Sequence, residues 1–122
     1  MKVLEVFNNW PDVVEVPAGA KIFAELEEGK HMFVVMSGEV ELTKRGEPLG
    51  AELPGGIIGE MAIIGSGAPL RSATASALQP SSLARVDREQ FLALIAENPE
   101  FALHVMQVLA NRLKVANMLR LS

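Results

Sequence analysis

The sequence predicts a mostly β fold followed by α-helices at its C-terminal end, and three observations support this prediction. Up to about residue 86 the apolar residues come in short runs that glycine, proline or charged residues interrupt. Such runs are typical of the many strands of a sandwich or barrel. Turn-forming residues lie between the runs, and from residue 87 onward the apolar residues follow helical spacing. We therefore expect a single domain over residues 1–122, with strands over about 13–86 and helices over about 88–119.

Tight turns divide the β part into short strands. Turns are predicted at residues 37–38 (Ser-Gly), 45–48 (Arg-Gly-Glu-Pro) and 53–56 (Leu-Pro-Gly-Gly). Aromatic residues make up only 5% of the chain, so the core between the strands must consist mainly of aliphatic side chains. The apolar runs that we expect to form strands lie at residues 13–16, 22–23, 32–36, 40–43, 57–58 and 83–86.

Two helices are expected after the strands. Asp87 is a good N-cap, and Gln90 three residues later completes a variant of the capping box, so a short amphipathic helix follows. Asn98 and Pro99 end this helix and begin a second one, because asparagine caps helices and proline is favoured in the first turn. The second helix carries more apolar surface than one β domain needs to cover, and we therefore expect a homodimer through this helix. Its apolar stripe consists of Leu103, Met106, Leu109, Leu113 and Ala116.

Composition and charge exclude several classes of function. The chain has no cysteine, which removes disulfides, thiol catalysis and thiolate metal sites. Its apolar runs are too short to span a bilayer and its N-terminus does not resemble a signal peptide, so we expect a cytoplasmic protein without a membrane partner. The net charge of −4 argues against binding of nucleic acid by this chain alone.

The last residues of the chain are basic. After Glu100 the sequence contains Arg112, Lys114 and Arg120 but no acidic residue. We interpret these cations as the solvated face and C-terminal end of a helix, where positive charge complements the helix dipole. Contact with nucleic acid or a membrane is the alternative.

Residues for catalysis or metal binding are lacking in the sequence. His31 and His104 are the only histidines, and they are too far apart to supply the clustered ligands of a metal-dependent β-barrel enzyme. No set of nucleophile, base and orienting residue is evident. We therefore predict that the chain is not an enzyme and needs no metal or cofactor.

One segment of small residues, from 55 to 77, carries an isolated positive charge. Arg71 is the only charged residue between Met61 and Ala84, so either a distant carboxylate or an anionic ligand must neutralise it. Upstream, Gly59 leads into a helical turn whose free backbone N–H groups suit a phosphate. Glu60 at the same point could accept a sugar hydroxyl or complement the helix dipole. A nucleotide cradle and a structural Arg71–Glu60 ion pair both remain open on these grounds.

Residues 59–75, GEMAIIGSGAPLRSATA, resemble the phosphate-binding cassette of the cyclic nucleotide-binding domain family. This family includes catabolite-activator-type regulators, regulatory subunits of cyclic-nucleotide-dependent kinases, and cyclic-nucleotide-gated channels. Residues 16–23, 32–40, 87–91 and 97–100 are similar to other parts of the family, so the resemblance covers about residues 14–119. It implies a jelly-roll-like β-roll, a double-stranded β-helix, capped by the C-terminal helices.

The resemblance also implies a role for each matching residue. Glu60 would accept the ribose 2′-hydroxyl, and Arg71 would pair with the cyclic phosphate. The final helix would close over the base near Ala116 and Asn117, with Arg112 as a second candidate one turn earlier. Of the remaining site residues, Gly59, Met61 and Ala62 would supply backbone N–H groups, Ser72 and Ala73 would contact the phosphate, and Leu42 and Leu49 would face the base.

The sequence departs from the family pattern at several positions. Leu70 stands between Pro69 and Arg71, where the family usually places proline directly before the arginine. Ala116 replaces a frequent threonine at the base-reading position. The other departures are Gly56 in place of a common aspartate and Leu26 in place of a frequent turn glycine.

The resemblance implies a ligand and a mode of action. Ser72 after Arg71 is more similar to cAMP-type cassettes than to cGMP-type ones, which often have threonine there. We therefore expect a regulatory sensor that binds cAMP in preference to cGMP and signals to an unidentified effector protein through movement of its C-terminal helices. The alternative is a degenerate β-roll that binds no nucleotide and acts as a dimerisation or docking module. An allosteric DNA-binding regulator would require a partner domain beyond these residues.

Overall fold

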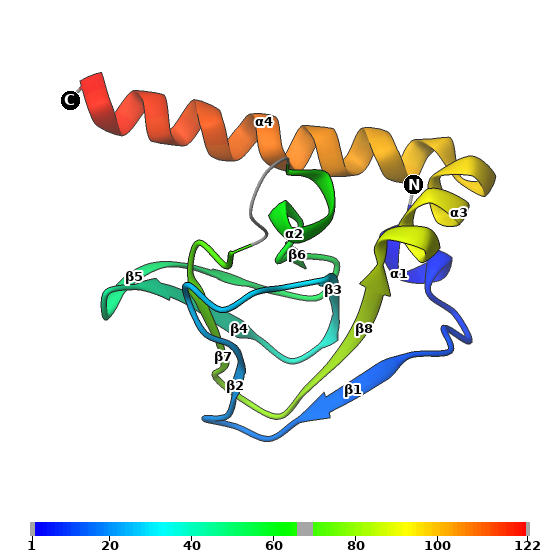
Figure 1. Cartoon of the computed structure of the whole chain (residues 1–122), viewed down its shortest axis with the longest axis horizontal. Helices are drawn as coiled ribbons and strands as arrows, with labels where there is room; N and C mark the ends of the chain where they lie inside the picture. Colours follow the sequence, from blue (N-terminus) through cyan, green and yellow to red (C-terminus); the bar gives the residue numbers. More distant parts are fainter. Residues whose placement is uncertain (1, 66–69, 122) are drawn as a thin grey trace.

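The fold consists of a β-roll followed by two helices, with a short helix at the N-terminus (Figure 1). The computed structural model describes residues 2–65 and 70–121. Pro69 is therefore outside the described residues. In chain order the elements are α1 (Val3–Val6), β1 (Val13–Val16), β2 (Lys21–Phe23), β3 (His31–Ser37), β4 (Val40–Lys44), β5 (Glu47–Glu52), β6 (Ile57–Ile58), α2 (Met61–Ile64), β7 (Thr74–Ala77), β8 (Ser81–Asp87), α3 (Arg88–Glu97) and α4 (Pro99–Leu121).

The strands form two antiparallel sheets, as expected for a jelly-roll-like β-roll. One sheet has the order β1-β8-β3-β6 and the other has the order β2-β7-β4-β5. Consecutive strands often belong to different sheets, so the chain crosses repeatedly between the two layers. The predicted fold class, mostly β with C-terminal helices, is confirmed.

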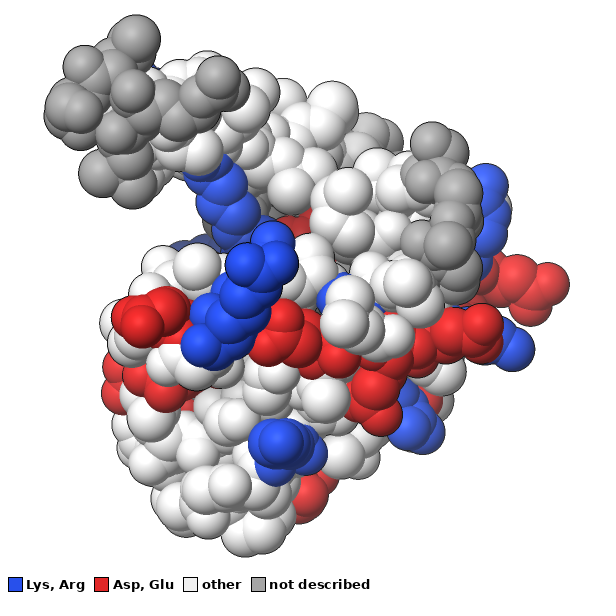
Figure 2. All heavy atoms as spheres, turned by 60° about the vertical axis from the view of Figure 1, so that its left-hand side comes forward, with Lys and Arg blue, Asp and Glu red and all other residues white. Residues whose placement is uncertain are grey.

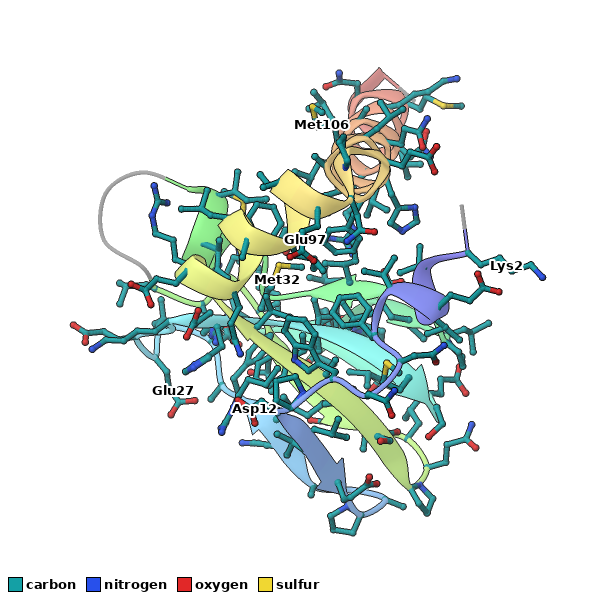
Figure 3. All side chains as sticks on the ribbon, turned by 90° about the vertical axis from the view of Figure 1, so that its right-hand side faces the viewer. Lys2, Asp12, Glu27, Met32, Glu97 and Met106 are labelled. Atoms are coloured by element: carbon teal, nitrogen blue, oxygen red, sulfur yellow. The ribbon has the colours of Figure 1, made fainter. Side chains whose placement is uncertain are left out.

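Strand β3 is buried on both of its faces, which joins the sheets to the helices. Phe33 and Val35 point between the two sheets and pack with residues such as Leu83. Met32 and Val34 point to the opposite side, where they pack with the helices in a second core cluster (Figure 3). Because successive side chains of a strand alternate between faces, a single strand supports both clusters and fixes the helices on the roll.

The start of α3 follows the prediction closely. The side chain of Asp87 accepts a hydrogen bond of 2.7 Å from the backbone N–H of Gln90, and the Gln90 side chain accepts one of 2.9 Å from the backbone N–H of Asp87. This reciprocal pair is the predicted capping box. Helix α4 begins at Pro99, as expected, and extends across the top of the molecule in Figure 1.

The face that α4 presents to the roll differs from the predicted stripe. Phe101 and Val105 are fully buried against the roll, and Leu109 is partly buried. In contrast, Leu103, Met106 and Leu113 are 52%, 58% and 63% exposed. Most of the predicted stripe thus lies away from the roll, and the side of the helix that faces the roll also includes Arg112.

Helix α1 was not predicted. It covers only four residues, too few for a periodic pattern. The segment after it packs on the roll, because Trp10 Nε1 donates a 2.9 Å hydrogen bond to the carbonyl of Arg85 in β8. Within the segment, the rings of Phe7 and Trp10 meet edge to face, with their centres 5.0 Å apart. Phe7 also meets Phe101 at 5.5 Å, so the N-terminal segment helps to hold the first part of α4.

Candidate functional site

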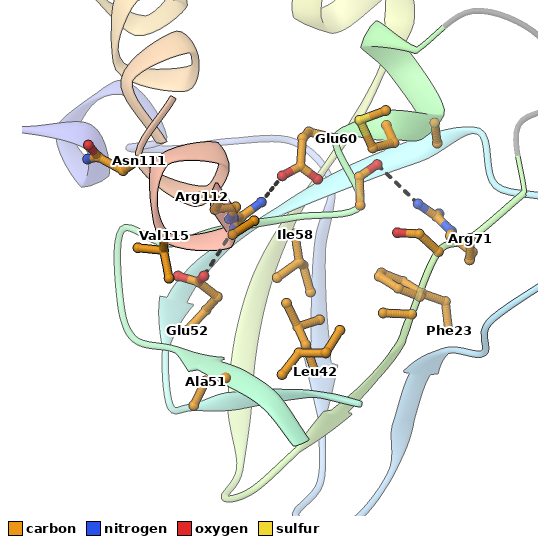
Figure 4. Close-up of a pocket in the computed structure, with 18 of the residues that line it drawn as sticks. Phe23, Leu42, Ala51, Glu52, Ile58, Glu60, Arg71, Asn111, Arg112 and Val115 are labelled. Carbon is orange, nitrogen blue, oxygen red and sulfur yellow. Dashed lines mark hydrogen bonds and ion pairs between the residues drawn. The ribbon is translucent and has the colours of Figure 1, made fainter. Parts of the chain in front are cut away.

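A cavity of about 590 Å³ lies between the β-roll, α2 and α4. This volume is within the usual range for pockets that bind small molecules. Figure 2 shows the hollow beneath the C-terminal half of α4, and Figure 4 shows the side chains around it. The lining comes from β5, from the turn between β6 and α2, from residues 70–73 before β7, and from α4.

Arg71 is a buried cation in the wall of this pocket. Only 7% of the residue is exposed. Its guanidinium carbon lies 4.2 Å from the centre of the Phe23 ring, and its Nη1 donates a 3.2 Å hydrogen bond to the carbonyl of Gly59. Its buried Nε has no hydrogen-bond partner, and no carboxylate of the described residues lies within ion-pair distance of it. Burial lowers the pKa of Arg71, but the charges of Glu27 and Glu60 oppose this effect, and arginine stays protonated in proteins.

Two glycines make room for the Arg71 guanidinium. A Cβ atom on Gly59 would lie 2.5 Å from Nη1 of Arg71, and Gly59 has a φ of +73°, which favours glycine. A Cβ atom on Gly29 would overlap the guanidinium itself. Gly59 was predicted to act through its backbone N–H group, and its lack of a side chain is a second requirement of the site.

The backbone of Arg71 is fastened to the loop between β2 and β3. Its N–H donates to the carbonyl of Glu27 and its carbonyl accepts from the N–H of Leu26, both at 2.8 Å. Leu70 forms an isolated antiparallel bridge with Glu28, next to these two hydrogen bonds. The presence of Leu70 between Pro69 and Arg71 therefore does not move Arg71 out of the pocket wall. Leu26 has a φ of +70°, which agrees with a turn where the family often has glycine.

Glu60 lies at the start of α2 and is paired with α4. Only 5% of Glu60 is exposed, and its carboxylate accepts a hydrogen bond from Nη1 of Arg112. Nη2 of Arg112 donates to Glu52 at 3.0 Å and to the carbonyl of Ile57 at 2.6 Å. Glu60 therefore pairs with Arg112. The Arg71–Glu60 ion pair, which was one of two possibilities suggested by the sequence, is not formed. Interpretation of Arg112 as a solvated cation was wrong, because the helix turns its side chain toward the roll.

The structure brings nearly all the predicted site residues to one pocket. Asn117 is the exception: it is exposed on α4 and lies outside the lining. Helical geometry explains this, because Arg112, Val115 and Ala116 share one face of α4, and Asn117 lies about 100° further round the helix. The nine predicted residues that line the pocket are Leu42, Leu49, Gly59, Glu60, Met61, Ala62, Arg71, Ser72 and Ala73.

Several other residues of the lining were not predicted from the sequence. Asn111 and Val115 are four residues apart on α4, so helical spacing from Arg112 and Ala116 could have identified them. Phe23 was assigned only to a strand, yet it lies beneath the guanidinium of Arg71. Glu52 is the last residue of the exposed strand β5 and gave no signal in the sequence, because an isolated carboxylate at a strand end is usually solvated.

The described residues contain neither a cluster of metal ligands nor a helix that could span a membrane. No group of three or more histidine, aspartate or glutamate side chains among residues 2–65 and 70–121 could hold a metal ion. His31 begins β3, whereas His104 lies on α4 and stacks on Phe101 at 6.4 Å. Among the described helices, none combines the length and the apolar character that crossing a bilayer requires.

The chain matches a known family over most of its length. A family model described as "Cyclic nucleotide-binding domain" matches residues 13–98, which is well over half of the chain. Fold, pocket and sequence thus agree, and the chain belongs to the cyclic nucleotide-binding domain family.

Relatives of the chain include regulators and channels. The chain is 31% identical over 110 residues to the "CRP-like cAMP-activated global transcriptional regulator" of Mycobacterium tuberculosis, covering 85% of this chain and 48% of that protein. It is 44% identical over 88 residues to the "Cyclic nucleotide-gated potassium channel mll3241" of Mesorhizobium japonicum, covering 71% of this chain and 23% of the channel. The chain therefore spans about half the length of the regulator and a smaller part of the channel.

A solved structure has the same fold. The catabolite activator protein of Thermus thermophilus superposes with a TM-score of 0.77 at 33% identity, over 95% of this chain and 54% of that one. The β-roll and its C-terminal helices are therefore common to both proteins.

Proposed function

We propose that this chain is a regulatory sensor domain that binds a cyclic nucleotide in the pocket, with cAMP favoured over cGMP. The observation that carries the proposal is the buried guanidinium of Arg71. A buried charge is costly unless an opposite charge and hydrogen bonds compensate for it. An anion beside Arg71 would supply both, and a cyclic phosphate carries one negative charge and exposed oxygens that suit a guanidinium.

The rest of the pocket suits the other parts of a nucleotide. Ser72 and Ala73 adjoin Arg71 in the lining and would add hydroxyl and amide contacts to the phosphate. Glu60 lies across the cavity and would accept a hydrogen bond from the ribose 2′-hydroxyl (Figure 4). Apolar residues of β4, β5 and α4 would enclose the base. A ligand of about 22 heavy atoms that gains roughly 0.3–0.4 kcal/mol per atom would bind with micromolar affinity.

The preference for cAMP rests on Ser72. A serine directly after Arg71 resembles cAMP-type cassettes, whereas cGMP-type ones often have threonine at this position. The name of the Mycobacterium tuberculosis relative describes it as cAMP-activated, which supports the same ligand.

The ligand would signal through α4. Arg112, Val115 and Ala116 line the pocket from this helix, while Phe101 and Val105 anchor its first part to the roll. A nucleotide that contacts the second half of α4 would therefore change its position or its mobility relative to the anchored part. An effector protein in contact with α4 would detect this change.

The exposed face of α4 favours a homodimer. Leu103, Met106, Leu113 and Met118 lie outside the pocket lining and are all more than half exposed, which is unusual for large apolar residues of one helix. A second copy of the same helix would cover them with surface of the same apolar character. Sedimentation of the protein as a monomer at high micromolar concentration would contradict this part of the proposal.

Calorimetric titration with cAMP and cGMP tests the proposed function. The wild-type protein should bind cAMP with micromolar affinity and cGMP more weakly, and Arg71→Ala should abolish both signals. Arg85→Ala is the matched control, because Arg85 forms an exposed ion pair with Asp12 away from the pocket lining. A folded wild-type protein that binds neither nucleotide at millimolar concentration would instead support the alternative of a docking or dimerisation module.

A further inference from the structure

Arg112 is held by two carboxylates, and only one of them has a role in the proposed nucleotide site. Its Nη1 binds Glu60, which would accept the ribose hydroxyl, and its Nη2 binds Glu52 at 3.0 Å. Glu52 ends β5 and lines the same cavity. The Arg112 side chain is 35% exposed and that of Glu52 is 27% exposed, so both groups lie at the edge of the pocket (Figure 4).

The space for the Glu52 side chain depends on Gly56. A Cβ atom on Gly56 would lie 2.5 Å from Oε2 of Glu52 and 2.9 Å from its Cβ. Any larger residue at position 56 would therefore displace Glu52 from its place beside Arg112. The turn before β6 thus positions this second carboxylate, which makes the Glu52–Arg112 contact a built feature of the pocket wall.

Glu52 also changes the charge balance of the cavity. The charged residues in the lining are Glu52, Glu60, Arg71 and Arg112, whose formal charges cancel. A cyclic nucleotide brings one more negative charge into this neutral lining. Without Glu52 the lining would carry a net positive charge, and Arg112 would have donors free for the ligand.

We propose that Glu52 is an internal competitor for Arg112 that weakens the binding of a cyclic nucleotide. This inference rests on the proposed function of the pocket. In the free protein Glu52 holds Nη2 of Arg112 against the roll, so the ligand must either displace this contact or bind without it. Since Arg112 also contacts Glu60 and the carbonyl of Ile57, α4 stays attached to the roll when Glu52 is changed.

The affinity of cAMP for four proteins tests this inference: wild type, Glu52→Gln, Arg112→Gln and the double variant. Glu52→Gln keeps the shape of the side chain and removes its charge, and it should tighten binding about two- to fivefold, in the range of a partly exposed ion pair. In the Arg112→Gln background the same change should have much less effect, because the competition is absent. Glu47→Gln, on the same strand but outside the lining, is the control for net charge and should leave the affinity unchanged.

The possible outcomes separate this inference from the proposed function. If wild type binds and Glu52→Gln binds no more tightly, the competition is refuted while the sensor function stands. An equal gain from Glu52→Gln in the Arg112→Gln background, or from Glu47→Gln, would also refute it, because the gain would then be a general charge effect. Failure of all variants to bind overturns both. If the wild type does not bind cAMP and the Glu52→Gln variant does, the result would support the competition directly. Glu52→Ala is measured in parallel, so that the test does not depend on correct folding of the glutamine variant.

Discussion

Replacement of Arg71 by methionine should stabilise the free protein and abolish nucleotide binding. The arginine is 7% exposed, and its Nε has no hydrogen-bond partner. Replacement of a buried ion pair by apolar side chains of similar volume is often neutral or stabilising by about 1–4 kcal/mol, and Arg71 has no ion-pair partner among the described residues whose attraction would be lost. The lost hydrogen bond to the Gly59 carbonyl and the lost contact with the Phe23 ring together offset about 1–2 kcal/mol of this gain. A net gain of about 1 kcal/mol corresponds to about 4 °C in Tm.

Thermal unfolding followed by circular dichroism, with and without cAMP, measures both effects. Without nucleotide, Arg71→Met should unfold at a Tm equal to or above that of the wild type. With cAMP at about 100 times its Kd, the wild type should gain about 2.7 kcal/mol and the variant nothing. Arg85→Met, which removes an exposed ion pair, serves as the control and should retain the full ligand effect. A variant that unfolds several degrees below the wild type without ligand would show that Arg71 is a structural residue and refute the reasoning.

Three further predictions concern the backbone and the core. Gly59→Ala should abolish cAMP binding in calorimetry, because the new Cβ would lie 2.5 Å from Nη1 of Arg71; retained affinity would argue against this geometry. Leu26→Gly should raise the free energy of unfolding by about 0.5–1 kcal/mol, because Leu26 has a φ of +70°, which favours glycine, and its side chain is 73% exposed. A lower free energy of unfolding in urea would contradict this prediction. Phe101→Ala should lower the free energy of unfolding by about 3–5 kcal/mol, because Phe101 is fully buried among aromatic rings; a loss below 1 kcal/mol would show that α4 is not anchored there.

Local signals in the sequence predicted much of the fold. The capping box at Asp87 and Gln90 depends on residues three positions apart, so it can be recognised without knowledge of the tertiary structure. Short apolar runs located six of the eight strands in the described part of the chain, but β5 and β7 were missed because they contain charged, glycine, proline or small residues rather than an apolar run. The runs also could not reveal how the strands divide between two sheets. The side of α4 that faces the roll could not be predicted, because it includes a charged residue, Arg112, whose partners Glu52 and Glu60 are distant in sequence.

The site was predictable where its residues adjoin in sequence. Residues 59–62 and 71–73 lie in one cassette, and all of them line the cavity. Contacts between distant segments could not be predicted: Arg112 and Glu52 are 60 positions apart, and nothing in their spacing links them. The same holds for Gly29, whose role follows only from its position against the Arg71 guanidinium.

The central claim is that the guanidinium of Arg71 pairs with the phosphate of a cyclic nucleotide. Nitrogen-15 NMR of the arginine Nε–Hε groups, with the Arg71 signal assigned from its absence in Arg71→Lys, observes this group directly. Addition of cAMP should shift the Arg71 Nε–Hε signal and slow its exchange with water, because a buried Nε that lacks a partner would gain a phosphate oxygen. An Arg71 signal that stays unchanged while cAMP saturates the protein would contradict the claim.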